Sequence, residues 1–561
     1  MHSIPSPLQT IVTAHFTTLL YWFSDEMYQR LSGRVQSHFL LQLGETLDFA
    51  PLEQACADYH HHRGPGAPPT HLVPRLIRAL LVKYLQDLSF RQLEEEIRWN
   101  LQVKRFVGYA IFEPGPDHAT LERFDAWVQT HHPRLFFDEV LKQIDQEFPR
   151  DRLKAQIGDT YALRANAASE SLIQLLRHAG QRLLRTFEKV AGEEALAAMK
   201  EELDLPALYG AQGERIEFHL DKEERRQRLQ DATVAVLQCQ ERIRSWLAEH
   251  ADRTQPPELT LWLETVDKII ADELSIEKEE GGGAEVTAVR ELSKKEKGRY
   301  RIASATDPDA TFRVHGERID LGYNVNVAAT DAFIREIRAD TGSQPDAVAI
   351  PDLITAQQAH HDLTPPKLIY DKAAGTGKTL AKVDEVSQGQ TRLVAPLADY
   401  AHRHGHRFGP DNFILAPEGD ALTCPNNQVS VIAYRSRSGD GRVFRFSPGQ
   451  CTGCPLTQAC RGDKVPPDRM RQVFISDHRT ILAQARTYQQ TPQFKLDMKR
   501  RTTIERIIAQ LVRYHGARNA RYCGRDKNDY QAKQNATAFN LRQWLRQLQR
   551  RSAAAQIPST A

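Results

Sequence analysis

The sequence lacks a charge excess, a cysteine framework and a long hydrophobic run, and each absence narrows the class of protein. Its 561 residues hold 74 Lys and Arg against 72 Asp and Glu, so any affinity for nucleic acid must come from local clusters of cations. Its seven cysteines are an odd number, which favours metal binding or reduced thiols over a secreted disulfide framework. The stretch from Pro7 to Phe23 has no Asp, Glu, Lys or Arg, but Gln9, His15 and four threonines make it a poor membrane span. We expect a soluble, cytoplasmic protein that does not bind membranes, in which this stretch is a packed helix or an irregular arm.

One stretch near the C-terminus has both a start and a stop signal for a helix. Thr491 is a good N-cap, Pro492 suits the first helical position, and Gly516 suits the residue after the last turn. These signals predict one long helix from Pro492 to His515. An apolar stripe at helical spacing runs along its second half and consists of Ile504, Ile507, Ile508, Leu511 and Val512.

Glu505 lies at the edge of that stripe, in a segment that is rich in cations. From Lys499 to Lys527 there are nine Lys and Arg residues against two acids, Glu505 and Asp526. Three interpretations of Glu505 are open. It pairs with cations on a solvated face, it closes a capping box with Thr502, or it binds a metal ion beside a polyanion.

The N-terminal third predicts helices. Residues 24 to about 61 have helical character, and the breaker-rich segment 62–69 is expected to be a linker. Residues 72–85 carry apolar side chains at helical spacing, and Ser89 with Gln92 predicts a capping box that starts a second helix through Asn100. Two helices joined by a short turn suit a DNA-binding module, although ordinary helical bundles share this geometry. Cations lie in and after the second helix, at Arg91, Arg98, Lys104 and Arg105.

The middle of the chain alternates between strand and helix character. A strand-like run over residues 153–161 contains Asp159 near its end, and amphipathic helical sequence follows from about 170 to 274. Residues 277–298 contain three successive glycines and many charges, which predicts a flexible connector. Strand character returns in short runs at 311–314, 322–328, 347–350 and 367–371. The pattern predicts a mixed α/β sheet that an inserted helical domain divides in sequence.

Four of the seven cysteines lie close together in sequence, before the predicted C-terminal helix. A Cys-x-x-Cys pair with two further thiols nearby can surround a tetrahedral Zn²⁺ ion, although the spacing is less regular than in paired Cys-x-x-Cys motifs. Inert free cysteines and a redox pair are the alternatives. The candidate zinc ligands are Cys424, Cys451, Cys454 and Cys460.

Three acids stand out by their positions. Asp159 and Asp371 follow apolar strand-like runs, and Glu505 lies on the predicted helix. Acids at strand ends and on a flanking helix can converge on one site that holds two divalent ions for phosphodiester chemistry. Each acid alone is weak evidence, because Asp159 and Asp371 also suit turns or helix N-caps.

The sequence resembles the DDE transposases of bacterial insertion sequences, which have a ribonuclease-H-like core. The resemblance covers about Leu72 to Leu548. It rests on residues 80–95, Phe106-Val-Gly and residues 116–124 in the helical part, and on Ile157-Gly-Asp159-Thr160 with Ala165-Asn-Ala, residues 306–310 and residues 322–325 in the expected core strands. Ile369-Tyr-Asp371-Lys and Ile504-Glu505-Arg match the family's second and third acids, and a cysteine cluster before the last acid is also a feature of relatives.

The resemblance implies that Asp159, Asp371 and Glu505 hold two Mg²⁺ or Mn²⁺ ions, and that Arg501 corresponds to the family's arginine on the same helical face. Relatives often have a Tyr and a Lys where this chain has Met498 and Val512. The chain is expected to bind the double-stranded DNA of terminal inverted repeats and of the target, and to act as a homodimer on DNA in the bacterial cytoplasm, associated with the nucleoid. The residues expected to contact DNA are Arg501, Arg506, Arg513, Arg518 and Arg521.

We therefore predict an α/β protein whose ribonuclease-H-like mixed sheet is split by a helical insertion and preceded by an all-α domain. The expected function is cleavage of transposon ends and their joining to target DNA. A catalytically inactive DNA-binding relative and a nuclease without strand transfer are the alternatives. The expected segments are a helical DNA-binding domain (1–148), the first part of the core (149–169), the helical insertion and linker (170–299), the continued core (300–420), a Cys-rich module (421–470), the C-terminal catalytic helix and basic region (471–550) and a disordered tail (551–561).

Overall fold

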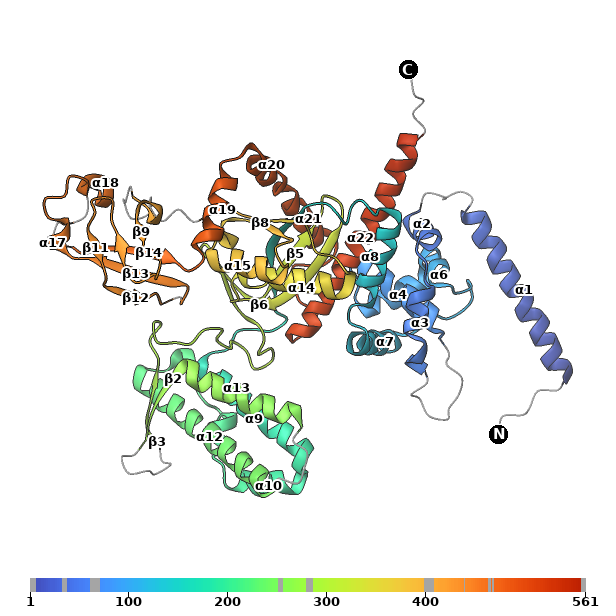
Figure 1. Ribbon diagram of the computed structural model, residues 1–561. Coiled ribbons are helices and arrows are strands. Elements are labelled where there is room, and N and C mark those ends of the chain that lie inside the picture. Colours follow the sequence, from blue (N-terminus) through green and yellow to red (C-terminus); the bar gives the residue numbers. More distant parts are fainter. Residues whose placement is uncertain are drawn as a thin grey trace, which may run out of the picture.

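The computed structural model describes most of the chain as four connected parts, in which a central sheet lies between helical and β-rich parts (Figure 1). None of the helices in these described stretches is long and apolar enough to cross a membrane. The described residues are 7–32, 38–60, 71–250, 256–278, 286–397, 408–437, 439–462, 466 and 469–555. The predicted linker at 62–69 lies outside them.

The N-terminal part is built from short helices around one apolar core, and α1 stands beside it. The helix predicted over 72–85 is confirmed as α4, and the capping box of Ser89 and Gln92 starts α5 as predicted. The same core also receives Tyr530, Trp544 and Leu545 from the C-terminal helix. The helices are α1 (Pro7–Ser32), α2 (Phe39–Thr46), α3 (Ala50–Ala55), the 3-10 turn η1 (Ala57–His60), α4 (Val73–Gln86), α5 (Phe90–Trp99), α6 (Leu101–Val107), α7 (His118–His131) and α8 (Leu135–Glu147).

A mixed sheet forms the centre of the molecule, which confirms the predicted α/β core. Its order is β4-β5-β1-β7-β8, and β6 pairs with β5. β1 runs antiparallel to β5, with Ile157 opposite Ala329, and parallel to β7. The strands are β1 (Gln156–Arg164), β4 (Thr311–His315), β5 (Arg318–Ala329), β6 (Ile334–Thr341), β7 (Lys367–Ile369) and β8 (Arg392–Val394).

Helices cover both faces of this sheet, which is the layer arrangement that buries alternate side chains of each strand. One face packs on α14 (Ile350–His361) and α15 (Gly377–Val386), which are preceded by the short turns η3 (Asp346–Val348) and η4 (Lys372–Ala374). The other face packs on α8, α21 (Thr502–Tyr514) and α22 (Arg525–Ala555). The helices α19 (Arg479–Gln489) and α20 (Pro492–Arg500) lead into α21.

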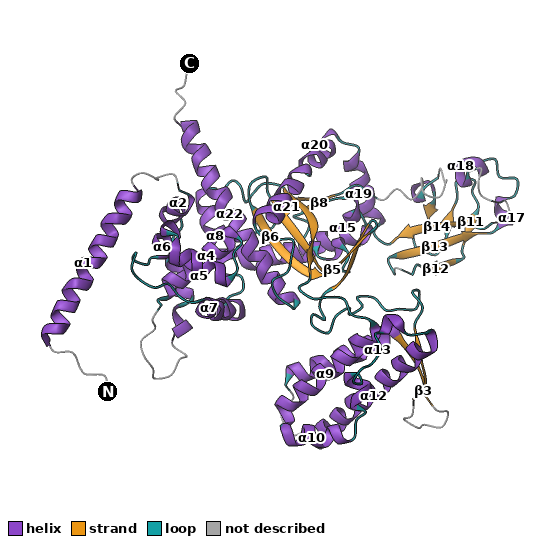
Figure 2. Cartoon of the chain, turned by 180° about the vertical axis from the view of Figure 1, so that it is seen from behind, coloured by secondary structure: helices purple, strands orange, loops and turns teal. Residues whose placement is uncertain are grey.

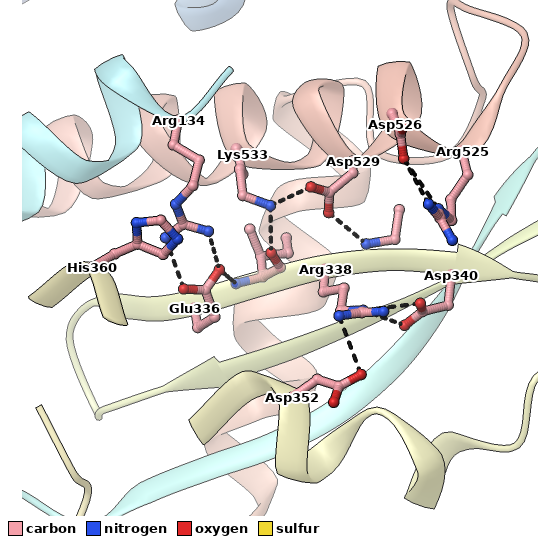
Figure 3. A network of polar contacts seen from close by, with 12 residues as sticks. Arg134, Glu336, Arg338, Asp340, Asp352, His360, Arg525, Asp526, Asp529 and Lys533 are labelled. Carbon is pink, nitrogen blue, oxygen red and sulfur yellow. Dashed lines mark hydrogen bonds and ion pairs between the residues drawn. The ribbon is translucent and has the colours of Figure 1, made fainter. Parts of the chain in front are cut away.

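Polar side chains of α22 bind the free edge of β6. Asn540 accepts a hydrogen bond from the Ile334 N–H at 2.9 Å and donates one to the Ile334 carbonyl at 2.9 Å. Asp529 accepts from the Ala339 N–H at 2.9 Å, and Lys533 donates to the Ile337 carbonyl at 3.2 Å (Figure 3). These contacts supply partners for backbone groups that an edge strand otherwise leaves unpaired.

Ion pairs keep the charged side chains of β6 buried. Glu336 pairs with Arg134 at 2.9 Å, and Arg338 pairs with Asp340 at 2.9 Å and with Asp352 at 3.1 Å (Figure 3). Glu336 and Asp340 are almost completely buried. β6 is not predicted by the sequence, because its alternating charges are typical of an exposed segment.

A buried carboxylate connects the helical part to the C-terminal segment. Asp125 on α7 accepts hydrogen bonds from Tyr84 at 2.7 Å, Tyr522 at 2.7 Å and Tyr530 at 2.8 Å. Lys83 lies in the same buried region, and burial lowers its pKa to about 8. Three hydroxyl donors on one carboxylate therefore bind α4, α7 and α22 together.

The helical insertion has its own apolar core and forms a separate lobe (Figure 2). The connector predicted at 277–298 is wrong in part, because β2 and β3 form an antiparallel hairpin there; the three glycines lie outside the described residues. The insertion contains α9 (Leu172–Ala191), α10 (Glu193–Glu201), α11 (Leu205–Tyr209), η2 (Glu217–His219), α12 (Lys222–Glu249), α13 (Pro257–Glu273), β2 (Leu274–Lys278) and β3 (Val286–Glu291).

A small β-rich module follows β8 and carries the cysteine cluster. It has two three-stranded sheets, β11-β10-β9 and β12-β13-β14, and a core that includes Phe413, Phe444 and Phe446. Its elements are η5 (Pro410–Asn412), β9 (Ile414–Leu415), β10 (Leu422–Thr423), β11 (Val429–Ser430), β12 (Ala433–Arg435), β13 (Gly441–Phe446), α17 (Pro448–Cys451), α18 (Thr457–Arg461) and β14 (Arg471–Ser476).

Several local predictions were wrong. The strand predicted at 347–350 is the turn η3 and the start of α14, because Pro351 suits the first turn of a helix. The single long helix is interrupted at Arg501 and forms α20 and α21. Residues 306–310, expected in a core strand, form a turn before β4. The tail predicted from 551 is helical up to Ala555, and its remainder lies outside the described residues. The predicted domain limits stay predictions.

We predict that Asp125→Ala destabilises the protein more than the loss of any one of its partners. The substitution leaves three hydroxyl groups without their acceptor and removes the negative charge that lies near Lys83, so the free energy of unfolding should fall by about 3 kcal/mol or more. Tyr84→Phe removes one hydrogen bond and should cost about 1 kcal/mol. Urea unfolding followed by tryptophan fluorescence measures both changes. Equal losses in the two variants would contradict the role of Asp125 as the shared acceptor.

Candidate functional site

Asp159 lies in the middle of β1, which corrects the prediction that the strand ends there. It stands opposite Val327 of β5, and the strand continues to Arg164. Alternation along the strand places Asp159 on the same face as Ile157, the face that packs against α21. The Thr160 N–H donates to its carboxylate at 2.9 Å.

Gly158 allows the ring of Tyr370, the residue after β7, to approach β1 directly. A Cβ atom at this position would lie 2.0 Å from a ring carbon of Tyr370, so no larger residue fits without a shift of that ring. Tyr370 is buried and immediately precedes Asp371. The close packing of these two residues brings the start of the Asp371 turn next to Asp159.

Asp371 follows β7, as predicted, and is the N-cap of η4. Its carboxylate accepts a hydrogen bond from the Ala373 N–H at 2.9 Å. Asp371 therefore caps a helical turn, which is one of the two roles that the sequence allowed. The second carboxylate oxygen of Asp371 makes no hydrogen bond with any described residue, so it remains available for another contact.

Glu505 lies on the first turns of α21 with 63% of its side chain exposed. The predicted capping box with Thr502 does not form, since Arg501 occupies the N-cap position without a side-chain cap. Arg501 instead joins two of the predicted acids. Its guanidinium lies 3.2 Å from the Asp159 carboxylate and 3.4 Å from the Glu505 carboxylate. The interruption between α20 and α21 falls at this residue.

The electrostatics show that other carboxylates lie near Asp159. Burial raises the pKa of Asp159, and the charges of Asp371 and Asp346 raise it further, against the lowering effect of the Thr160 N–H and of Arg501. The other two predicted acids are thus connected with Asp159, Glu505 through the Arg501 guanidinium and Asp371 through charge repulsion.

Asp346 is an acid near this site that the sequence analysis missed. It begins η3, which packs against η4, and accepts a hydrogen bond from Asn324 at 2.6 Å. Asp346 was overlooked because a strand was predicted at 347–350, and an acid just before a strand does not by itself indicate a functional site. Asn326, two residues along β5, is completely buried, and neither of its amide atoms has a hydrogen-bond partner in the described protein.

The donor set of the site consists of carboxylate oxygens, which suits Mg²⁺ or Mn²⁺ better than softer metals. The repulsion that raises the pKa of Asp159 is the kind that a divalent cation relieves. Within the described stretches, no three Asp, Glu, His or Cys side chains are close enough together to hold a metal ion. Asp159 and Glu505 are therefore held by Arg501, and the three acids are not arranged as metal ligands in the described structure.

The cations near Glu505 differ in their contacts. Arg506 and Arg513 are exposed on α21 and form no ion pair with a described carboxylate, and Arg518 is half-buried. Arg521 binds Asp87 and the Leu88 carbonyl, so its guanidinium is used in a contact between the C-terminal segment and the helical part.

The cations of the predicted N-terminal DNA-binding module are mostly used within the protein. Lys104 is buried and donates to the Ile111 carbonyl at 2.8 Å, and Arg98 pairs with Glu94 at 2.7 Å. The Arg105 guanidinium lies over the Tyr28 ring. Arg91 is exposed and has no ion pair within the described part of the chain.

The four clustered cysteines line one cavity of the β-rich module. Burial raises the pKa of the Cys451 and Cys460 thiols, which favours their neutral form. The four thiols are thus neighbours, but in the described structure they do not form a metal-binding group. The other cysteines, Cys56, Cys239 and Cys523, lie elsewhere in the chain and are also free.

Comparison with known proteins gives two family matches. Residues 29–127 match the family described as Transposase domain (DUF772), and residues 423–545 match the family described as Transposase DDE domain. No curated protein and no solved structure matches the chain. The second match contains Arg501, Glu505 and all four clustered cysteines, whereas Asp159 and Asp371 lie outside both matches. The two families indicate a DNA transposase, and together with the mixed α/β core they support a DDE transposase of the insertion-sequence type.

Proposed function

We propose that the protein cleaves the ends of a transposon and joins them to target DNA, with Asp159, Asp371 and Glu505 as the catalytic acids. The observation that carries this proposal is the contact of Arg501 with both Asp159 and Glu505, which lie far apart in sequence. Asp371 lies near enough to raise the pKa of Asp159. An acidic site of this kind, in a chain with two transposase matches, suits phosphodiester cleavage.

The three carboxylates would hold the divalent cations, Mg²⁺ or Mn²⁺, that DDE transposases generally use. Such ions supply the activation of the attacking oxygen and the stabilisation of the leaving oxygen. The carboxylate of Asp159 is fixed by the Thr160 N–H, and that of Asp371 by the Ala373 N–H. Each of these bonds leaves oxygen lone pairs available. Glu505 is mostly exposed, and release of its contact with Arg501 would let it turn toward the other two acids. Arg501 neutralises the site when no cation is present and is placed to contact a DNA phosphate.

The first test is DNA cleavage by variants of the three acids. Asp159→Asn, Asp371→Asn and Glu505→Gln keep the side-chain shapes but remove the charges, so each should lower Mg²⁺-dependent cleavage of end-containing DNA by about a hundredfold or more. Asp331→Asn, which breaks a surface ion pair with Arg500, is the matched control and should retain activity.

Three outcomes of this assay separate the proposal from its alternatives. Wild-type activity in any of the three acid variants contradicts the assigned triad. Cleaved ends without joined product indicate a nuclease without strand transfer. No cleavage by the wild type, with DNA binding retained, indicates an inactive relative, which the departures at Met498 and Val512 from the family pattern would explain.

We further propose that α21 and the segment after it face DNA, with Arg501, Arg506, Arg513 and Arg518 near the backbone, and that the N-terminal helices bind the transposon ends. Because Arg506 and Arg513 are exposed and pair with no carboxylate in the described part of the chain, Arg506→Gln and Arg513→Gln should each reduce the slope of log binding constant against log salt by about 1. Arg244→Gln, in an exposed pair with Asp267 on the insertion, is the control. Fluorescence anisotropy with a labelled duplex across a salt series measures the slopes. An unchanged slope in both α21 variants would contradict a DNA-facing α21.

The cysteine cavity is proposed to hold a structural zinc ion, since four thiols line it. Binding would deprotonate the thiols, whose pKa values are otherwise raised by burial. We predict about one zinc per chain in protein purified without chelator, lost in the double variant Cys451→Ser with Cys454→Ser and retained in Cys523→Ala. Elemental analysis measures the metal content. Wild-type protein that contains no zinc, and whose melting temperature does not rise with added zinc, would contradict the site.

The proposed reaction joins two transposon ends, so we propose that the protein acts as a homodimer on DNA. Its place of action would be the bacterial cytoplasm, at the nucleoid.

A further inference from the structure

The helix α1 has two opposite faces with different contacts. At 100° per residue, Tyr21, Ser24 and Tyr28 lie on one side of the helix. Phe16, Leu19, Trp22 and Phe23 lie on the other. Figure 1 shows α1 beside the N-terminal helices, with one side turned away from the rest of the molecule.

Hydrogen bonds fix the orientation of the inner face. Tyr21 donates to Glu113 at 2.8 Å, the Ser24 hydroxyl accepts from the Ile111 N–H at 2.9 Å, and Tyr28 donates to the Tyr109 carbonyl at 2.9 Å. Tyr21 also packs edge-on against the ring of Phe112, with centroids 5.1 Å apart. Since all these contacts are on one side, the outer face cannot turn inward without breaking them.

The outer face is apolar and exposed. Phe16, Leu19, Trp22 and Phe23 are 60%, 58%, 62% and 56% exposed. Four large apolar side chains next to each other on an exposed helix are unusual for a surface that stays in water. Other exposed hydrophobic residues are spread over separate elements, such as Phe218 on η2, Trp99 on α5 and Leu261 on α13.

The charge pattern identifies the kind of partner. No Asp, Glu, Lys or Arg occurs from Phe16 to Phe23, and the next charges on this side, Glu26 and Arg30, pair with each other at 2.7 Å. A surface without free cations attracts neither DNA phosphates nor anionic lipids. An uncharged apolar stripe does suit an identical stripe, because two copies related by a twofold axis meet without like-charge repulsion.

The available area suits a weak pair. An aromatic side chain buries about 150–250 Å² when fully covered, so the four side chains at their exposures offer roughly 450 Å² per copy. Two copies would bury roughly 900 Å², which is the size of weak or transient interfaces, so we expect a dissociation constant on the order of micromolar.

We propose that the outer face of α1, defined by Phe16, Leu19, Trp22 and Phe23, is the surface through which two copies of this chain pair in solution. The pairing needs neither DNA nor divalent ions. It therefore goes beyond the proposed homodimer on DNA, and its test does not depend on catalytic activity.

Sedimentation velocity of the full chain, from about 0.5 to 50 µM without DNA or metal ions, tests the pairing. The wild type should shift from monomer to dimer over this range. The triple variant Phe16→Ser, Trp22→Ser and Phe23→Ser should raise the dissociation constant at least tenfold, as expected for the loss of central aromatic contacts. The matched control, Ile216→Ser with Phe218→Ser, removes exposed apolar side chains at η2 of the helical insertion and should dimerise as the wild type does. Asp159→Asn should also dimerise as the wild type does, so the pairing is tested independently of the proposed catalysis.

Variants of Leu19, at the middle of the stripe, test whether the partner is a second copy. Leu19→Glu and Leu19→Lys should each be monomeric alone, because like charges meet, and an equal mixture should dimerise. A wild type that remains monomeric at the highest concentration, a triple variant that dimerises as tightly as the wild type, or a mixture no tighter than either single variant would each overturn the proposal. Unchanged circular dichroism and melting temperature show that the variants are folded.

Discussion

The rest of the structure depends on α22, a buried helix whose polar side chains bind backbone groups of the sheet. An edge strand such as β6 leaves N–H and C=O groups unpaired, and burying them without partners would cost free energy at each group. Asn540, Lys533 and Asp529 supply those partners from one side of α22. Tyr530 binds Asp125 of the helical part. A single helix thereby completes the sheet and attaches the N-terminal helices to it.

The catalytic candidates are positioned by elements that are attached to this framework. The segment between α21 and α22 binds the end of β1, where the Arg164 N–H donates to the Arg518 carbonyl at 2.9 Å and the Ala520 N–H donates to the Arg164 carbonyl at 2.7 Å. α21 packs its Ile504, Ile507 and Leu511 onto the sheet. Asp159 and Glu505 are thus placed by the same layer of packing, and the contact with Arg501 follows from it.

The sequence predicted the helices and strands that depend mainly on interactions between neighbouring residues. The Ser89 capping box and the apolar spacing of residues 72–85 located α4 and α5, and short apolar runs located β1, β4, β5 and β7. β6 was missed because the partners that bury its charges, such as Arg134 for Glu336, are about two hundred residues away in sequence. The same holds for Asp346, whose nearness to Asp159 arises only when η3 packs against η4. The acids Asp159, Asp371 and Glu505 stood out by their positions after strand-like runs and on the predicted helix, and the family resemblance then implied that they hold metal ions together.

The helical insertion also affects how the chain is made. β1 leaves the ribosome long before β5, its main partner, because the insertion lies between them. At a synthesis rate of about 5–20 residues per second, β1 waits roughly 10 to 30 seconds for that partner. The insertion can complete its own core during this interval, since its apolar cluster draws on few residues outside it. The strand that carries Asp159 meanwhile remains an unpaired apolar segment, of the kind that chaperones bind in a nascent chain.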